Sequence, residues 1–250
     1  MILSEDVVAH RDWLLNFVEL PEPGAVVDLG CGSGADLLTL AKRARHPKNR
    51  FVGLDSSEKG IAVAAGTATD TRLEFRQARL EAPFPLGDHE FDVAYSSNLL
   101  ECLADPAAFA REVGRILKPG GTVVIGHWDW DSQVYGGSDK ALVRRLVHAF
   151  ADWKQAWMDY ADGWMGRRLW GIFNQTGLFD GTPHARVLTN TIYSEPWYGH
   201  ERANDFRSLV KRNLASADDV ATFIAEQEVL ATAGRYFYSI TGYAFVGRRR

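Results

Sequence analysis

The stretch VVDLGCGSGAD, residues 26–36, joins an apolar run to an acid and then to three glycines at alternate positions, Gly30, Gly32 and Gly34. A helical pattern of apolar residues begins directly afterwards, at Leu37. This order predicts a strand, a tight turn and the start of a helix. Glycines at this spacing allow positive φ and a close approach of a ligand to the backbone, and the free N–H groups of the new helix face the same crevice. We therefore expect a ligand at this turn.

The spacing of the glycines distinguishes two kinds of nucleotide-binding turn. A dinucleotide-binding turn reads G-x-G-x-x-G, whereas here the third glycine comes one residue early. With Asp28 in front of it, the turn resembles motif I of class I S-adenosylmethionine-dependent methyltransferases. In that family the loop holds the methionine part of the cofactor. The resemblance implies that S-adenosylmethionine is bound by Asp28, Gly30, Cys31, Gly32 and Gly34.

The composition describes a soluble globular chain. Of its 250 residues 46% are hydrophobic and 24% charged, so one domain spanning residues 1–250 is expected. A net charge of −4 argues against a nucleic-acid partner or an anionic membrane, because both call for a clustered positive face. The two cysteines, Cys31 and Cys102, are far apart and show no metal-ligand spacing, so we expect neither a disulfide nor a metal site.

The N-terminal segment predicts a helix rather than a secretion signal. Glu5 and Asp6 stand where a signal peptide carries positive charge, and no window approaches the roughly 18 to 20 apolar residues of a membrane span. We therefore expect a cytoplasmic protein, and the sequence leaves its oligomeric state open. Ser4 reads as a helix N-cap, and apolar residues recur on one side until Pro21. The resemblance implies that this helix folds over the cofactor, so that Arg11 either meets the cofactor carboxylate or lies exposed in solvent.

A second strand, Phe51 to Leu54, ends in an acid at the edge of the sheet where α/β folds place ligands. A carboxylate at this point can accept both hydroxyls of a ribose. We therefore expect Asp55, with the adjacent Ser56, to bind the cofactor ribose. Asp55 can also serve as an N-cap for the helix that starts near Ser57, and the two roles can coexist.

The stretch QARLEAPFPL, residues 77–86, follows a short third strand, Leu73 to Phe75. Relatives in the resembled family usually show an acid near Ala78 that holds the adenine amino group, and here that acid is missing. The backbone at Arg79 and Leu80 can replace it, or Glu81 can reach back, and the sequence does not choose between them.

The fourth strand, Phe91 to Tyr95, begins FDVAYSSNLLECL, which resembles motif IV of the same family. The resemblance implies that the following loop lines the sulfonium, with the cofactor contacted by Ser96 and Ser97 and the acceptor by Asn98. The family often has histidine where Cys102 stands. The Asn/Asp/Ser-Pro-Pro-aromatic sequence of enzymes that methylate amino groups in DNA or protein glutamine is absent, which favours another substrate. The resemblance covers roughly residues 24–126 and includes LKPGG at 117–121.

The second half of the chain departs from this common core. The patterns predict a fifth strand at Thr122 to Gly126, a long helix from near Ser138 to Trp164, a break around Gly166 and Gly171, a helix stop at Gly177, a sixth strand at Arg186 to Tyr193, a helical insertion at Ala203 to Ala233 and a last strand at Tyr236 to Val246. The resemblance implies that the last strand is antiparallel and inserted beside the fifth. The expected fold is therefore a Rossmann-like, seven-stranded, mostly parallel sheet with helices on both faces. A cap formed by residues 127–180 and 196–233 completes it.

The most consistent function is an S-adenosylmethionine-dependent methyltransferase that yields S-adenosylhomocysteine, needs no metal and acts on a small molecule, at oxygen or nitrogen more readily than at carbon. A hydroxyl or protonated amine must lose its proton during transfer. His127, at the active-site end of the fifth strand, is the candidate base, and Asp129 is the candidate to orient or replace it. His127 can equally be a partner in ordinary loop hydrogen bonds.

Aromatic residues crowd the second half of the chain. Those expected to contact an aromatic or cationic acceptor are Trp128, Trp130, Tyr135, Trp164, Trp197 and Tyr198. Helical spacing from Leu142 to Trp164 gives the competing interpretation, a buried helix face. Two other functions stay open: a protein that binds the cofactor for regulation or for a non-methylating reaction, and a nicotinamide-dependent oxidoreductase.

Overall fold

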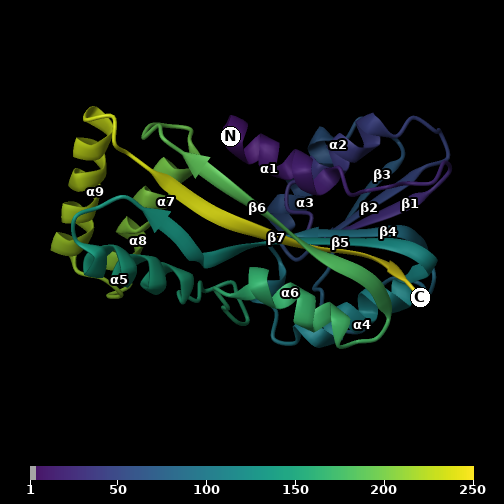
Figure 1. Cartoon of the computed structure of the whole chain (residues 1–250). Coiled ribbons are helices and arrows are strands. Elements are labelled where there is room, and N and C mark those ends of the chain that lie inside the picture. Colours follow the sequence, from purple (N-terminus) through teal and green to yellow (C-terminus); the bar gives the residue numbers. More distant parts are fainter. Residues whose placement is uncertain (1–3) are drawn as a thin grey trace.

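A computed structural model describes residues 4–250 as one seven-stranded sheet covered by helices (Figure 1). The strands are β1 (Ala25–Leu29), β2 (Arg50–Asp55), β3 (Leu73–Gln77), β4 (Phe91–Ser97), β5 (Leu117–Tyr135), β6 (Phe179–Asn190) and β7 (Tyr238–Arg249). Their order is β3-β2-β1-β4-β5-β7-β6. Strands β1 to β5 pair in parallel, and β7 is antiparallel to both β5 and β6. The expected sheet, with an antiparallel last strand inserted beside the fifth, is confirmed.

The helices cover both faces of this sheet. They are α1 (Glu5–Leu15), α2 (Ala35–Arg43), α3 (Glu58–Thr67), the short 3₁₀ turn η1 (Leu100–Cys102), α4 (Pro106–Ile116), α5 (Lys140–Ala151), α6 (Met165–Asn174), α7 (Tyr198–Asp205), α8 (Arg207–Lys211) and α9 (Ala217–Thr232). Figure 1 shows α1 and α2 on one face and α4 and α6 on the other. Apolar residues of α4 and α6, such as Phe109 and Phe173, are fully buried against one face of the sheet, and Leu14 and Leu37 against the other.

The fifth strand is much longer than expected. It continues from Leu117 to Tyr135, whereas the sequence patterns ended it at Gly126. The reason is its antiparallel partner β7, which pairs with β5 as far as Asp129 opposite Thr241 and, after an irregularity, again from Val134 to Tyr135. Residues 127–131 therefore belong to a strand and do not form a loop. Figure 1 shows the long strands β5 and β7 running out to the end of the molecule that carries α5, α7, α8 and α9.

The prediction of a long helix between Ser138 and Trp164 is wrong. Helix α5 ends at Ala151, and the segment 152–164 has no regular structure. The chain folds back here, so that a Cβ added at Gly163 would lie 2.6 Å from the Ala151 carbonyl oxygen. A straight helix would separate residues 151 and 163 by about 18 Å, at 1.5 Å per residue.

The expected break at Gly166 and Gly171 is also wrong, because α6 runs through both glycines. A Cβ at Gly166 would lie 3.0 Å from the Asp129 backbone nitrogen, so this glycine permits close packing of α6 on β5. Gly177, with φ of 68°, does follow the end of α6 as expected.

The remaining elements differ from expectation mainly at their ends. Strand β6 is shifted towards the N-terminus relative to Arg186–Tyr193, and the helical insertion consists of α7, α8 and α9. The Ser216 hydroxyl caps α9 by accepting a hydrogen bond from the Asp219 N–H at 3.0 Å. Ser4 precedes α1, but within the described chain its hydroxyl makes no capping bond.

Candidate functional site

The glycine turn after β1 is fixed directly to the end of β2. Gly30, Gly32 and Gly34 all have positive φ, at 82°, 52° and 76°. One Asp55 carboxylate oxygen accepts the Gly32 N–H at 2.8 Å, and the other accepts the Ser57 N–H at 2.8 Å. The acid is thus held between the turn and the first turn of α3. The N-cap of α3 is Ser57, whose hydroxyl accepts the Gly60 N–H at 3.1 Å, so the alternative expectation that Asp55 caps this helix is wrong.

A crevice of about 630 Å³ opens at this carboxyl edge of the sheet. Its lining residues come from the turns after β1 to β4 and from the segment after α5: Gly30, Asp55, Ser56, Ser57, Ala78, Arg79, Leu80, Glu81, Asn98, Leu99, Cys102, Leu103, Trp157 and Asp159. The structure therefore brings together six of the residues expected to bind cofactor or acceptor: Gly30, Asp55, Ser56, Arg79, Leu80 and Asn98. Edges of this kind are where α/β sheets place ligands.

The segment after α5 covers the crevice from the side of the cap. Asp159 and Tyr160 donate their N–H groups to the Cys102 carbonyl at 3.1 and 3.3 Å. The Asp159 carboxylate also accepts from Arg79 at 2.9 Å, across the crevice. Trp157 and Asp159 were missed by the sequence analysis because the helical spacing placed them on a helix.

A cluster of ionised and polar groups lies beside the glycine turn. Arg11 forms an ion pair with Asp36, and the Tyr95 hydroxyl donates to the other Asp36 oxygen at 2.9 Å. Burial, and then the charges of Asp36 and Asp55, raise the pKa of Asp28, while Arg11 acts in the opposite direction. Arg11 is therefore half-buried in a network and is not exposed in solvent. The cluster places one cation among three acids at the turn.

Residues at the end of β4 hold the strands of the sheet together, and the residue that follows lines the crevice. The buried Ser96 hydroxyl donates to the Leu29 carbonyl at 2.6 Å, which ties β4 to β1. Ser97 is half-buried and pairs with Gly126 in the sheet. Asn98 has a positive φ of 55°, and its side-chain oxygen accepts the Trp128 N–H at 2.9 Å while the residue lines the crevice. Asn98 thus links the crevice to β5.

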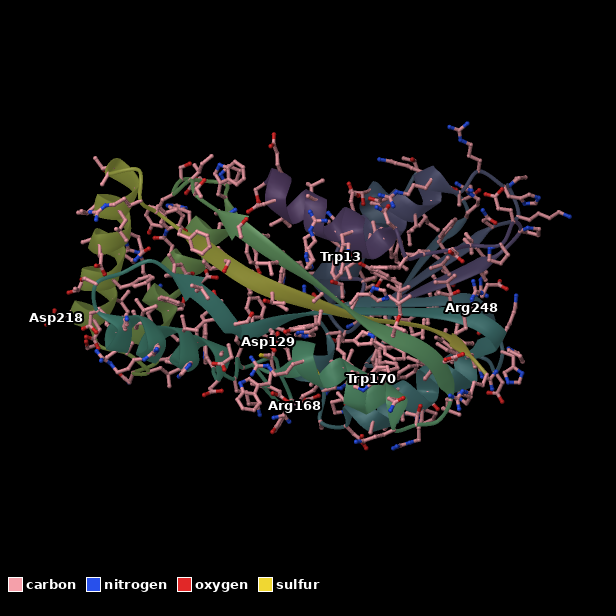
Figure 2. All side chains as sticks on the ribbon, viewed as in Figure 1. Trp13, Asp129, Arg168, Trp170, Asp218 and Arg248 are labelled. Carbon is pink, nitrogen blue, oxygen red and sulfur yellow. The ribbon has the colours of Figure 1, made fainter. Side chains whose placement is uncertain are left out.

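The surroundings of His127 and Asp129 differ from those expected of a catalytic base and the acid that orients it. His127 is 1% exposed, and its Nδ1 lies 2.7 Å from the Trp128 carbonyl oxygen; within residues 4–250 its Nε2 has no hydrogen-bond partner. Asp129, whose side chain is fully buried, forms a two-pronged ion pair with Arg167 of α6. Figure 2 shows Asp129 where β5 passes the start of α6, with Arg168 on the outer side of that helix. The carboxylate anchors α6 to β5 and does not orient His127.

Burial lowers the pKa of His127 to about 4, which makes the stability of the protein pH-dependent. Below pH 6.5 the unfolded chain binds a proton that the folded chain does not bind until about pH 4, so folding becomes less favourable as the pH falls through this window. Between pH 7 and pH 5 we expect the unfolding free energy to fall by about 2 kcal/mol more in the parent than in His127→Phe. Denaturant unfolding at the two pH values measures the difference. Equal pH dependence in both proteins would show that His127 is not held neutral.

The six aromatic residues expected at the acceptor lie in different surroundings. Trp128 is buried in a stack with His10 and Tyr198, at centroid distances of 3.8 and 5.3 Å. Tyr135 lies in the interior of the cap against Tyr238 and two phenylalanines. Trp164 is exposed and donates to Asp131 at 2.8 Å, and Trp197 precedes α7. Trp130 lines a second, smaller cavity.

Comparison with known proteins agrees with this geometry. A family model described as "Methyltransferase domain" matches residues 27–125, the span that contains the glycine turn, Asp55 and β4. The chain is 36% identical over 245 residues to an uncharacterized 37.1 kDa protein in transposon TN4556 of Streptomyces fradiae, covering 96% of this chain and 67% of that one. The chain belongs to the class I S-adenosylmethionine-dependent methyltransferases.

Other similar proteins match over a shorter stretch or at lower sequence identity. The chain is 36% identical over 122 residues to a trans-aconitate 2-methyltransferase of Azoarcus sp., covering 49% of this chain and 46% of that one. It thus spans about half the length of that curated relative. The crystal structure of the YcgJ protein from Bacillus subtilis superposes with a TM-score of 0.64 at 17% identity, covering 97% and 99% of the two chains, so the two proteins share a fold.

Among the helices within residues 4–250, none combines the length and hydropathy that a membrane crossing requires. In the same residues, no group of three or more His, Cys, Asp or Glu side chains is arranged to hold a metal ion.

Proposed function

We propose that this methyltransferase transfers the methyl group of S-adenosylmethionine to a small-molecule acceptor, at oxygen or nitrogen. The observation that carries the proposal is the Asp55 carboxylate, fixed by the Gly32 and Ser57 N–H groups at the mouth of the 630 Å³ crevice. The volume falls within the roughly 300 to 1,000 Å³ typical of small-molecule sites.

The residues of the crevice fit the parts of the cofactor. Asp55 would accept hydrogen bonds from the ribose hydroxyls, and Ser56 would contact the ribose beside it. The backbone of the glycine turn would face the methionine part of the cofactor. A Cβ added at Gly32 would meet nothing within 4 Å, so the turn leaves open space on this side. The backbone at Ala78 to Leu80 would bind adenine, because the acid found there in relatives is missing and the Glu81 side chain is paired with Arg79.

Methyl transfer requires mainly that the reacting atoms are aligned and that water is excluded. When bound, the cofactor supplies a methyl group made electrophilic by a positive sulfur. The protein would align the acceptor atom, the methyl group and the sulfur, which can account for much of the acceleration. Trp157 and Asp159 cover the crevice and would limit the entry of water.

A small acceptor suits the covered crevice better than a macromolecule. The segment 155–161 lies over η1 through the bonds to the Cys102 carbonyl, which narrows access from the cap. The Azoarcus relative is named for a small carboxylic acid acceptor. We do not assign that acceptor to this chain. Cytoplasmic location and a role in small-molecule metabolism are part of this proposal.

Calorimetric titration of the full chain with S-adenosylmethionine, S-adenosylhomocysteine and NADPH tests the proposal. We expect saturable binding of the first two and none of the third, and transfer of label from methyl-labelled cofactor to an acceptor in a screen of phenols, amines, carboxylic acids and indoles. Binding of NADPH instead would favour an oxidoreductase. Tight cofactor binding without transfer to any acceptor would favour a regulatory or non-methylating protein.

A further inference from the structure

A second cavity lies inside the cap, bounded by β5, α5, the segment 153–161 and helices α7 and α8. Its volume is about 240 Å³. Three aromatic side chains line it, Trp130, Phe150 and Trp153, together with Met158. Its polar lining groups are Glu101, Gln155, Arg202, Asp205 and Ser208. The cavity therefore combines flat apolar walls with a few convergent polar groups, as small-molecule sites do.

This cavity shares its walls with the cofactor crevice. Glu101 lines the cavity, and the next residue, Cys102, lines the crevice. Met158 lines the cavity, while its neighbours Trp157 and Asp159 line the crevice. Side chains of η1 and of the cap segment thus alternate between the two spaces. The two spaces therefore adjoin along η1 and residues 157–159.

Glu101 lies on the side of the cavity next to the crevice, because the following residue lines the crevice. Burial raises the pKa of Glu101 to about 7; a hydrogen bond with Trp130 opposes the shift and the charge of Asp162 adds to it. The other titratable or charged groups around Glu101 are Cys102, Asp159, Tyr198, Arg202 and Asp205. Near neutral pH the carboxyl group can therefore accept and release a proton.

Arg202 from α7 supplies the cation of the cavity. It pairs with Asp205 at 2.9 Å and lies 4.8 Å from the centroid of the Tyr198 ring. Its Nε–H is buried and, among residues 4–250, has no hydrogen-bond partner. A buried donor without a partner is costly, so an oxygen of a ligand placed there would be stabilised.

We propose that this cavity is the acceptor site, and that it takes a one-ring hydroxylated aromatic molecule whose hydroxyl meets Glu101 and whose far end offers an oxygen to Arg202. The inference rests on the proposed function, because the acceptor must lie next to the methyl donor. The three aromatic walls suit a flat ring. The volume of about 240 Å³ is below the range for drug-sized ligands and suits a single ring.

The groups in the two sites account for every bond and proton that changes in the transfer step. The phenol oxygen forms a bond to the methyl carbon as the carbon–sulfur bond breaks, and the bonding electrons leave with sulfur. The phenol proton goes to the Glu101 carboxylate and from there to solvent. The products are the aryl methyl ether and S-adenosylhomocysteine. Glu101 is thus the catalytic base in place of the buried His127.

Binding is tested first, on the full chain saturated with S-adenosylhomocysteine. By calorimetry we expect 4-hydroxyacetophenone to bind, and acetophenone, which lacks the hydroxyl, to bind at least 5-fold more weakly. Ser208→Phe and Ala161→Leu enlarge two side chains that line the cavity, and each should weaken 4-hydroxyacetophenone binding at least 10-fold. Their affinity for S-adenosylhomocysteine should stay within twofold of the parent. Lys211→Phe, at an exposed position of α8, is the matched control and should bind like the parent.

Turnover of 4-hydroxyacetophenone then tests the base. We expect Glu101→Gln to lower kcat about 100-fold, a typical general-base effect, with KM within threefold of the parent. The parent kcat should rise with pH through an inflection near pH 7, where Glu101 becomes ionised, and the variant should lose this inflection. Glu228→Gln, at an exposed position of α9, is the control and should keep the parent profile.

The outcomes separate this inference from the proposed function. If the parent does not bind S-adenosylmethionine, the proposed function fails. If the cofactor binds but methyl groups go to phenethylamine and not to phenols, the inference is overturned. Unchanged phenol binding in both cavity-filling variants, or an unchanged pH profile in Glu101→Gln, overturns it as well.

Discussion

Alanine in place of Arg167 is expected to lower the free energy of unfolding by about 3 kcal/mol, the lower end of the cost of breaking a buried ion pair. Asp129 has a fully buried side chain, and Arg167 donates to both of its carboxylate oxygens. Without Arg167 the carboxylate would remain buried with its charge uncompensated. The lower end of the range applies because the Arg167 side chain is 39% exposed, so water can partly replace it.

Arg168 on the same helix is the matched control for this experiment. Its side chain is 52% exposed and pairs with Asp162 at 3.1 Å, so Arg168→Ala should cost about 1 kcal/mol or less, as exposed pairs do. Urea unfolding of both variants gives the comparison. Similar costs for the two would mean that Asp129 finds water or another partner. In that case the ion pair between Arg167 and Asp129 would not be what anchors α6 to β5.

Asp55→Ala is expected to weaken S-adenosylmethionine binding by about 1.5 to 3 kcal/mol, the scale of hydrogen bonds lost to a charged group, or roughly 10- to 150-fold in Kd. Two losses contribute to this effect. The ribose would lose its carboxylate partner. The Gly32 and Ser57 N–H groups would lose theirs, so the turn that faces the methionine part would be held less firmly.

Glu58→Ala is the control for charge near the crevice, because Glu58 is exposed at the start of α3 and does not line the crevice. Calorimetry should give a Kd within twofold of the parent for this control. Thermal unfolding of both variants verifies that the fold persists. An Asp55→Ala protein with the parent Kd would place the ribose elsewhere in the crevice.

The first half of the chain could be predicted because its signals are local. Strand, turn and helix follow one another within residues 26–37, and parallel strands bring their carboxyl ends to one edge. The position of Asp55 beside Gly32 follows from that rule and from the length of one strand–helix–strand unit.

The second half could not be predicted because its decisive contacts are long-range. Trp153 and Trp157 have helical spacing from Leu142, yet the chain turns back and packs Gly163 against Ala151. Nothing in the spacing of the aromatic residues encodes that contact. Tertiary structure overrides local pattern at such places.

Glu101 was missed for the same kind of reason. An acid after two leucines is most simply explained as a solvent-exposed residue at a helix start. It is half-buried because the cap segment, more than 50 residues later, contacts the neighbouring Cys102 carbonyl. The sequence signal that could have found it is an acid inside the otherwise apolar stretch LLECL, residues 99–103.

The pairing of β5 with β7, which resumes after the irregularity that follows Asp129, affects how an acceptor would be selected. The same two strands carry Thr122 opposite Arg248 in the core and Tyr135 opposite Tyr238 in the cap. Core and cap are therefore joined by strand pairing and not by a flexible linker, so in the proposed assignment the acceptor cavity is held rigidly relative to the sheet. Such a preorganised template lowers the ordering cost of binding. It also means that an acceptor one bond too long cannot be accommodated by a hinge motion, so acceptor length should be discriminated more sharply than acceptor width.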